Sequence, residues 1–252
     1  MVSLIRFRSA DDATSHLTLT LEGTLHAIAL RRAPRVKRMT LRLRNASRDF
    51  VLTLPQSVTL ATARDFLERH RGWMVERLRR LPAPVALTPD AVIPLRGIAH
   101  RIVHRPAGLR DVIIEAQCGK GTGPMFNLCV SGPLADVPGL LLAYLKREAQ
   151  RDLAAAVRFH AGKIGKSVKR VTIRDTTSRW GSCSSTGNLN FSWRLVLAPG
   201  YVLDYLAAHE VAHLLHMDHS ARFWQTANHL SADVERAEAW LKTQGAKLHQ
   251  IG

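Results

Sequence analysis

The sequence predicts an α+β protein in which a β-rich, basic region over residues 1–135 precedes a largely helical region over residues 136–252. Three observations predict this division. Apolar and polar residues alternate through much of the first region, as in half-buried strands. Apolar residues recur at helical spacing over about residues 138–161, which predicts a long helix. A second helix near residue 209 carries several histidines, and a small antiparallel sheet is expected between the two helices.

The first region begins with two predicted hairpins. Residues 16–30 alternate on both sides of Gly23, and residues 39–44 and 50–54 alternate on both sides of a polar turn. An amphipathic helix is expected over about residues 60–80, because the prolines that follow it cannot continue a helix.

Short strands are predicted from there to about residue 130. The glycine-rich residues 119–123 predict a turn within this part, because they lack the spacing of a phosphate-binding loop. Ser131-Gly-Pro133 marks the expected boundary between the two regions.

The second region alternates short strands with helices. Residues 168–173 and 189–195 predict strands, joined by a loop over residues 176–187. Ser220 is a suitable N-cap for a short helix, and a final helix is expected from Ala232 to about Lys247.

His209-Glu-Val-Ala-His213 is the segment with the clearest chemistry. Histidines four residues apart lie on one face of a helix, so both imidazoles can reach one ion. Glu210 lies beside them, where it can accept a proton from an activated water. The apolar residues around the histidines are typical of a buried active-site helix. Catalytic zinc sites have three protein ligands and an open position, so this pattern predicts a Zn²⁺-dependent hydrolase.

The third ligand has several candidates. His219 comes six residues after His213 and can reach the ion only if the chain turns between about Leu215 and Asp218. The other candidates that follow the motif are His216, His229, Glu235 and Glu238.

Further segments resemble the YgjP-like metallopeptidases, which are related to the SprT/Spartan and WLM zinc peptidases. The resemblance covers about residues 170–245 and rests on Arg179-Trp-Gly-Ser-Cys-Ser184, Asn190-Phe-Ser-Trp193-Arg-Leu195, Ala198-Pro199, Asp204-Tyr205, His209-Glu-x-x-His213 and Asp218-His219-Ser-x-x-Phe223-Trp224. It implies a zincin-like catalytic part, with the long helix behind the His-Glu-x-x-His helix. Because the string that begins at Asp218 is intact, the resemblance favours His219 as the third Zn²⁺ ligand.

The segments beside this motif are the expected substrate cleft. Arg179, Trp180 and Asn190 are candidate substrate-binding residues, and the strand at 189–195 could pair with an extended peptide. The alternative is that Trp180 and Trp193 only support the active-site helix. Asp204 is a candidate hydrogen-bond acceptor for a ligand imidazole.

The composition of the chain indicates its expected cellular location and the charge of its expected partners. The net charge of +16 favours anionic partners such as nucleic acid or a nucleotide. No apolar run is long enough to span a membrane, and the apolar run among the first residues is too short for a signal peptide. A cytoplasmic protein is therefore expected. The three cysteines, Cys118, Cys129 and Cys183, do not suggest a disulfide framework.

Three functions follow from these observations. The first is a zinc metallopeptidase that acts on a peptide or protein, with Glu210 as general base. The second is a metal-dependent hydrolase of an anionic substrate such as a nucleoside triphosphate. The third is a protease associated with nucleic acid.

Overall fold

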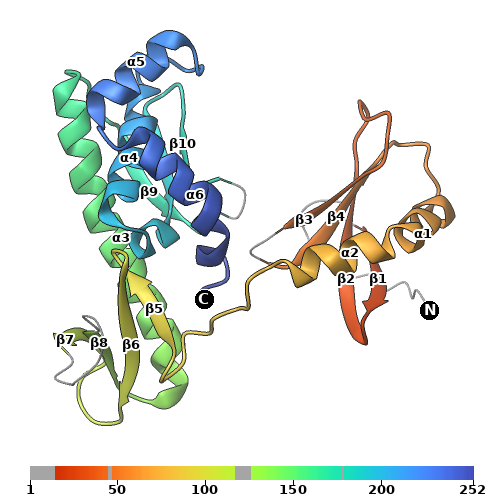
Figure 1. Cartoon of the computed structure of the whole chain (residues 1–252), viewed down its shortest axis with the longest axis horizontal. Helices are drawn as coiled ribbons and strands as arrows, with labels where there is room; N and C mark the ends of the chain where they lie inside the picture. Colours follow the sequence, from red (N-terminus) through yellow and green to blue (C-terminus); the bar gives the residue numbers. More distant parts are fainter. Residues whose placement is uncertain (1–14, 45–46, 117–125, 177–178) are drawn as a thin grey trace. The chain divides into compact units, whose positions relative to one another are not determined.

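The computed structural model of the chain describes residues 15–44, 47–116, 126–176 and 179–252 (Figure 1). The chain divides into two compact units, Met1–Pro82 and Ala83–Gly252. Cys118 and the turn predicted at residues 119–123 lie outside the described residues. No helix in the described part of the chain is long and apolar enough to cross a bilayer.

The N-terminal unit is a four-stranded sheet with two helices along one face (Figure 1). Its elements are β1 (Ser15–Leu21), β2 (Thr24–Arg32), β3 (Thr40–Arg44), β4 (Asp49–Leu54), α1 (Leu60–Arg69) and α2 (Arg71–Arg79). The two predicted hairpins, β1–β2 and β3–β4, are antiparallel and join through a parallel β2–β4 pair. Leu52 and other alternate residues of the sheet pack with Leu67 and Met74 of the helices in one apolar core.

The C-terminal unit begins with a second four-stranded sheet, in the order β5-β6-β8-β7. Its strands are β5 (Val92–Leu95), β6 (Ile98–Arg105), β7 (Val112–Ala116) and β8 (Phe126–Ser131). A short 3-10 turn, η1 (Leu134–Asp136), leads into the long helix α3 (Val137–Lys163). The sequence predicted α3 to within three residues at each end.

The rest of this unit surrounds a three-stranded sheet. Its elements are β9 (Arg170–Arg174), β10 (Gly181–Cys183), β11 (Asn188–Ser192), the 3-10 turn η2 (Trp193–Leu197), α4 (Gly200–Ala212), α5 (Ala221–Leu230) and α6 (Val234–Leu248). The predicted small antiparallel sheet is in fact mixed, with β11 antiparallel to β10 and parallel to β9. This follows from chain direction: β10 runs back along the outer edge of β11, so β9 and β11 run the same way.

The strand predicted over residues 189–195 ends earlier, at Ser192. The Ser192 hydroxyl accepts a hydrogen bond from the Arg194 backbone N–H and starts η2. All five side chains of η2 are buried, so the apolar pattern continues after the strand has stopped.

The β5–β6 hairpin is attached to the segment that precedes α4. Its turn residues Arg96 and Gly97 both have positive φ, at 52° and 78°. Their backbone N–H groups donate to the carbonyls of Val196 and Leu197, at 2.7 and 3.1 Å. The Arg96 side chain also forms ion pairs with Glu148 and Asp152 of α3. The sheet of β5–β8 is thereby joined to α3 and to η2, the segment that precedes α4.

The boundary between the units therefore falls at residue 82 and not near residue 135. Buried residues of β5–β8, such as Ile93, Ile102 and Leu128, belong to the same apolar core as α3 and α4. Alternation in the sequence shows that these strands exist, but it does not show which core their apolar faces enter.

A fragment of residues 83–252 should therefore fold cooperatively, whereas a fragment of residues 136–252 should not. The shorter fragment loses six fully or nearly fully buried apolar residues of β5–β8: Ile93, Leu95, Ile102, Val112, Leu128 and Val130. Each contributes about 1.5–3 kcal/mol by burial, and their sum is comparable with the roughly 5–15 kcal/mol that stabilises a whole domain. Thermal unfolding followed by circular dichroism tests both fragments. A cooperative transition in residues 136–252 would contradict the boundary at residue 82.

Candidate metal centre

α4 presents the histidines because its surroundings are apolar on nearly every side. It packs against α3, α5, α6 and η2, and residues such as Leu206 and Val211 are buried. His209 lies in its last turn and His213 is its C-cap residue. Their rings are 5.1 Å apart between centroids, as expected for residues one turn apart on one face.

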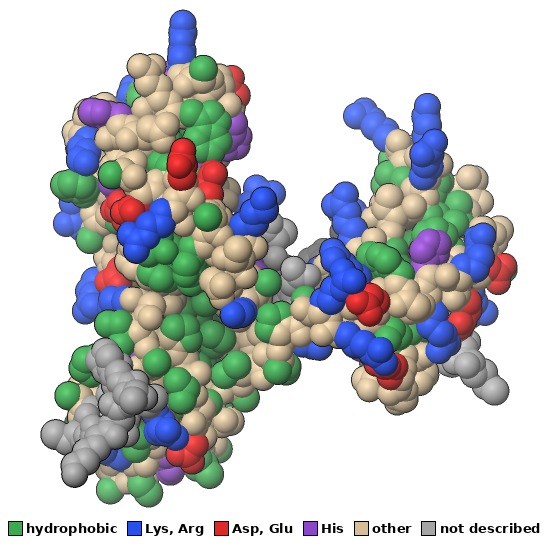
Figure 2. Space-filling view, viewed as in Figure 1, with side chains coloured by type: hydrophobic (Ala, Val, Ile, Leu, Met, Phe, Trp, Pro, Cys, Tyr) green, Lys and Arg blue, Asp and Glu red, His purple; other side chains and the backbone are tan. Residues whose placement is uncertain are grey.

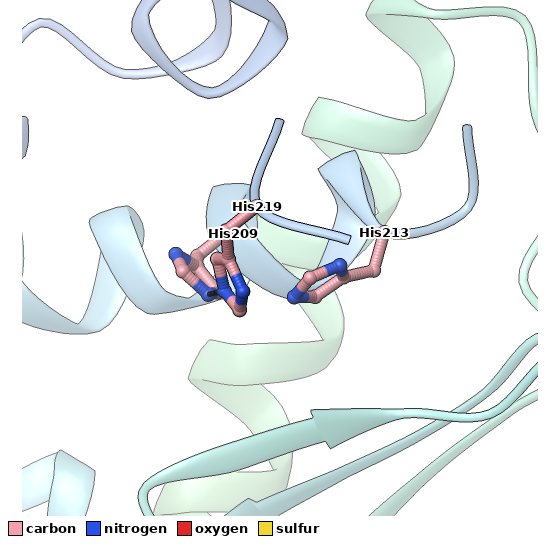
Figure 3. Close-up of side chains that lie close together, drawn as sticks. All are labelled: His209, His213 and His219. Atoms are coloured by element: carbon pink, nitrogen blue, oxygen red, sulfur yellow. Dashed lines mark hydrogen bonds between the residues drawn. The ribbon is translucent and has the colours of Figure 1, made fainter. Parts of the chain in front are cut away.

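The chain reverses directly after α4, which brings His219 back to the other two histidines (Figure 3). The turn begins at His213, slightly before the predicted interval. Ser220 then starts α5 as its N-cap, accepting a hydrogen bond from the Phe223 backbone N–H, as predicted. His219 Nε2 lies 3.3 Å from His209 Nε2. One nitrogen of each of the three rings lies within 4.8 Å of the others.

These nitrogens fit the geometry that a zinc ion requires. Zn–N bonds of about 2.0–2.1 Å at tetrahedral angles place two ligand nitrogens about 3.3–3.4 Å apart. The His209–His219 nitrogen separation already has this value, and no separation in the set exceeds 4.8 Å. Burial, with smaller contributions from the other two histidines, lowers the pKa of His209 to about 4. The imidazole is therefore neutral near pH 7, the form that binds a metal.

Hydrogen bonds to the Nδ1 atoms orient two of the rings. His213 Nδ1 lies 2.9 Å from the carbonyl oxygen of His216. His209 Nδ1 lies 3.2 Å from the Tyr205 hydroxyl, which donates to Glu238 Oε1 at 2.8 Å. Both contacts fit an imidazole that carries its proton on Nδ1 and leaves the Nε2 lone pair free for an ion.

Phe223 of α5 packs against the rings of all three histidines. Its side chain is fully buried, and its ring centroid lies 4.9 Å from His209, 4.5 Å from His213 and 4.8 Å from His219. The following residue, Trp224, contacts His209 and His219 at about 6 Å. The aromatic pair thus restricts how the imidazoles can rotate.

Glu210 is a buried carboxylate that faces the strand β10. It is 5% exposed, and its Oε2 atom has no hydrogen-bond partner among the described residues. Burial raises the pKa of Glu210 to about 7, and the positive charge of Arg179 opposes this rise. A cation between the histidines would favour the ionised form further. A Cβ atom at Gly181 of β10 would lie 2.4 Å from Glu210 Oε1, so only glycine leaves room for this side chain.

The site opens into a pocket of about 260 Å³. The pocket is lined by Arg179, Gly181, Ser182, Cys183, His209, Glu210, His213, Met217 and His219. Burial raises the pKa of the Cys183 thiol to about 11, which keeps it protonated. The lining therefore combines one buried carboxylate, three imidazoles and one arginine.

The three candidate substrate-binding residues occupy different places. Arg179 is exposed and lines the pocket. The Trp180 ring instead stacks on His249 with centroids 4.3 Å apart. The Asn190 amide on β11 lies 3.5 Å from the Ser182 hydroxyl on β10. Trp180 and Asn190 thus adjoin the strand that lines the pocket.

The partner of Asp204 differs from the one expected, and Tyr205 takes the place beside a ligand candidate. Asp204 was predicted to accept a hydrogen bond from a ligand imidazole, but its Oδ1 lies 2.8 Å from Nε2 of His160 on α3. Asp204 precedes His209 by five residues, which turns its side chain away from the histidine face. Tyr205 precedes His209 by four residues, so helical spacing alone could have placed it beside that imidazole. Glu238 lies 33 residues from Tyr205, and no sequence signal connects the two.

Comparison with known proteins gives one family match. The family model described as YgjP-like, metallopeptidase domain, matches residues 37–244. No curated protein matches the chain. Among solved structures, the chain is similar to the crystal structure of the metallopeptidase zymogen of Pyrococcus abyssi abylysin, at 19% sequence identity and a TM-score of 0.32. That similarity covers 36% of this chain and 95% of the other chain.

Replacing Tyr205 by Phe should weaken zinc binding. The substitution keeps the buried ring but removes the hydroxyl that joins His209 Nδ1 to Glu238. Loss of such a supporting hydrogen bond costs about 10-fold to 100-fold in metal affinity. Competition with a chromophoric chelator measures the affinity. Tyr201→Phe is the matched control, because Tyr201 lies on the same helix under the Arg236 guanidinium. Equal zinc affinity in Tyr205→Phe and Tyr201→Phe would show that the hydroxyl does not support the site.

Proposed function

The chain belongs to the YgjP-like metallopeptidase family, and from this premise we propose that it hydrolyses peptide bonds at a zinc ion held by His209, His213 and His219. The observation that carries the proposal is the convergence of three imidazole nitrogens beside a buried carboxylate that has an unpaired oxygen. These groups share one pocket. We propose Glu210 as the general base.

The donor set favours zinc over harder ions. Three neutral imidazoles suit zinc, copper, nickel and iron, whereas magnesium and calcium prefer oxygen ligands. When bound by three protein ligands, zinc supplies a Lewis acid that activates water and polarises a carbonyl. This chain would offer it one ring nitrogen from each of the three histidines.

We propose that Glu210 moves a proton within the pocket. Glu210 lines the pocket, and its Oε2 atom has no hydrogen-bond partner among the described residues, so the carboxylate has a free acceptor for the proton of an activated water. In the same position it can later donate that proton to the leaving amine. Gly181 allows the carboxylate to lie directly against β10, where the substrate backbone would run.

The strand β10 is the proposed binding edge for the substrate. Among the strands that the structure describes it pairs with β11 alone, and it lines the pocket. An extended peptide could pair with its other edge through backbone hydrogen bonds, which tolerate many side chains. Trp180 and Asn190 would then support β10, and Arg179 would contact the substrate.

The pocket favours a peptide over a nucleoside triphosphate. Arg179 is its single permanently charged cation among the described residues. Sites that transfer or bind triphosphates use several cationic groups and backbone N–H groups to hold the phosphates. One exposed guanidinium does not provide such a cradle.

Glu210→Gln should abolish hydrolysis and retain zinc. The amide is nearly isosteric but cannot accept the proton, and general acid–base groups contribute about 10²–10⁴-fold to rate. Turnover of casein and of nucleoside triphosphates by the zinc-loaded protein, together with zinc content, tests this. Glu235→Gln on the exposed face of α6 is the matched control. Casein hydrolysis by Glu210→Gln at the parent rate would refute the assignment of the base. Hydrolysis of nucleoside triphosphates but not of casein by the parent protein would refute the proposal of a peptide substrate.

Gly181→Ala should also reduce hydrolysis strongly, because the new methyl group overlaps the Glu210 carboxylate and displaces it. Zinc content should remain close to that of the parent protein, because the three atoms nearest the new methyl group all belong to Glu210. Gly139→Ala in α3 is the control, because a Cβ atom there meets nothing within 4 Å. Unchanged turnover in Gly181→Ala would mean that the position of Glu210 against β10 is not required.

A further inference from the structure

The positive charge of the protein is concentrated in the N-terminal unit. Residues 1–82 contain 16 Lys and Arg against 7 Asp and Glu, a net charge of +9 out of the +16 of the whole chain. No acidic residue occurs between Glu22 and Asp49, and eight cationic side chains lie in that interval. The interval comprises β2, the β2–β3 loop and β3.

The sheet register places two of these cations on one face. Arg31 pairs across strands with Thr53, and Arg42 pairs with Val51. Thr53 and Val51 alternate with the core residues of β4, so Arg31 and Arg42 lie on the face opposite α1 and α2. β2 and β3 have β4 between them, and strands are about 4.8 Å apart. The partners Thr53 and Val51 are two residues apart along β4, which adds an offset of about 6.7 Å, so the two arginine backbones stand about 12 Å apart across the sheet.

The loop between β2 and β3 extends this surface. Arg35, Lys37 and Arg38 are exposed, and they have no salt-bridge partner among the described residues. Arg31 and Arg42 are likewise exposed and have no acidic partner there. Figure 2 shows a group of Lys and Arg side chains without acidic neighbours at the end of this unit where the β2–β3 loop lies. We define the β2–β3 basic surface as Arg31, Arg35, Lys37, Arg38 and Arg42.

The chemistry of this surface fits phosphodiesters. Four of its five cations are arginines, whose planar guanidinium groups bind phosphate oxygens in a bidentate manner. Short uncharged side chains such as Ala29 and Val51 lie beside the strand arginines on this face. Such short side chains would not hinder a nucleic-acid strand that lies across the sheet. The exposed large apolar side chains of this unit, Leu25, Leu60 and Trp73, lie outside the β2–β3 basic surface, which disfavours insertion into a lipid bilayer.

We propose that the β2–β3 basic surface binds nucleic acid through its phosphodiester backbone, without sequence preference. The surface contains no aromatic side chain for stacking on bases. The separation of about 12 Å between Arg31 and Arg42 corresponds to three to four base-pair steps of about 3.4 Å along the axis of a duplex. The proposal goes beyond peptide hydrolysis and does not depend on it, because it involves a different unit of the chain.

The test measures binding of the full chain to fluorescein-labelled 20-nucleotide RNA and 20-base-pair DNA by fluorescence anisotropy, over a series of salt concentrations. Log affinity should fall linearly with log salt, with a slope for each phosphate contact of about −0.9 on the DNA duplex and about −0.7 on the single-stranded RNA. The variant Arg31→Gln/Lys37→Gln/Arg38→Gln/Arg42→Gln should have a slope smaller by up to about 3.6 on the DNA and about 2.8 on the RNA. At 0.1 M salt it should bind between about 10-fold and about 10³-fold more weakly.

A second variant with the same net charge separates this surface from charge in general. Arg158, Lys166, Lys169 and Arg170 are exposed, have no salt-bridge partner among the described residues, and line a groove of the C-terminal unit. Their fourfold substitution by Gln also lowers the net charge from +16 to +12. It should leave the affinity within about 3-fold of the parent value and the salt slope unchanged to within about one phosphate contact, roughly 0.9.

Further measurements keep the result decisive. Replacing the three arginines of the first variant by Lys should retain most of the binding, because lysine still contacts phosphate as a point charge. Circular dichroism should show that each variant folds, and casein turnover should be unaltered. Equal loss in the two charge-matched variants would overturn the proposal. So would tighter binding to vesicles of phosphatidylserine and phosphatidylcholine than to either oligonucleotide.

Discussion

The chain reversal after Ala212 is the constraint on which the candidate centre depends. Two histidines of one helix face can reach an ion by themselves, but a third imidazole must come from a segment that returns. The reversal is fixed at its start by the contact of His213 Nδ1 with the carbonyl of His216 and at its end by Ser220, which caps α5. Phe223, three residues after that cap, then lies under all three rings. A ligand contact, a cap and an aromatic support thus come from eleven consecutive residues, 213–223.

The long-range parts of the site hold this local arrangement in place. Glu238 of α6 reaches His209 through Tyr205, and Gly181 of β10 admits Glu210 against the sheet. Each of these contacts joins α4 to a different neighbouring element. The candidate metal ligands are therefore close together in the sequence, whereas the residues that orient them lie on distant segments of the chain. A bond to Nδ1 selects the tautomer, and that choice decides which nitrogen is free for a metal.

Sequence reasoning succeeded where the physical signal is local. The limits of α3 followed from helical spacing, and the Ser220 cap followed from the side-chain chemistry of N-caps. The pair His209 and His213 needed only the pitch of a helix. His219 required the motif around it, because six-residue spacing does not specify a turn.

The parts that could not be predicted depend on tertiary contacts. The sequence of β5–β8 alternates as that of β1–β4 does, yet the two sheets enter different apolar cores. The link from Tyr205 to Glu238 joins residues 33 positions apart. Asp204 has the right chemistry for a ligand's partner but the wrong position on the helix, and it pairs with His160. In each case the residue types were suggestive, and only packing determined which atoms met.

The turn at Arg96 and Gly97 limits where residues can be inserted into or deleted from the chain. Its backbone bonds reach Val196 and Leu197, and Gly97 lies so close to Pro199, the N-cap residue of α4, that a Cβ atom would be 3.0 Å from the proline Cα. An insertion or deletion that moved this contact by one residue along η2 would shift the segment that leads into α4 by about 2 Å. Functional groups tolerate displacements of only about 0.5 Å. The β5–β6 hairpin thus fixes the position at which the histidine helix begins. The number of residues in this hairpin is therefore constrained as strictly as the identity of the candidate ligands.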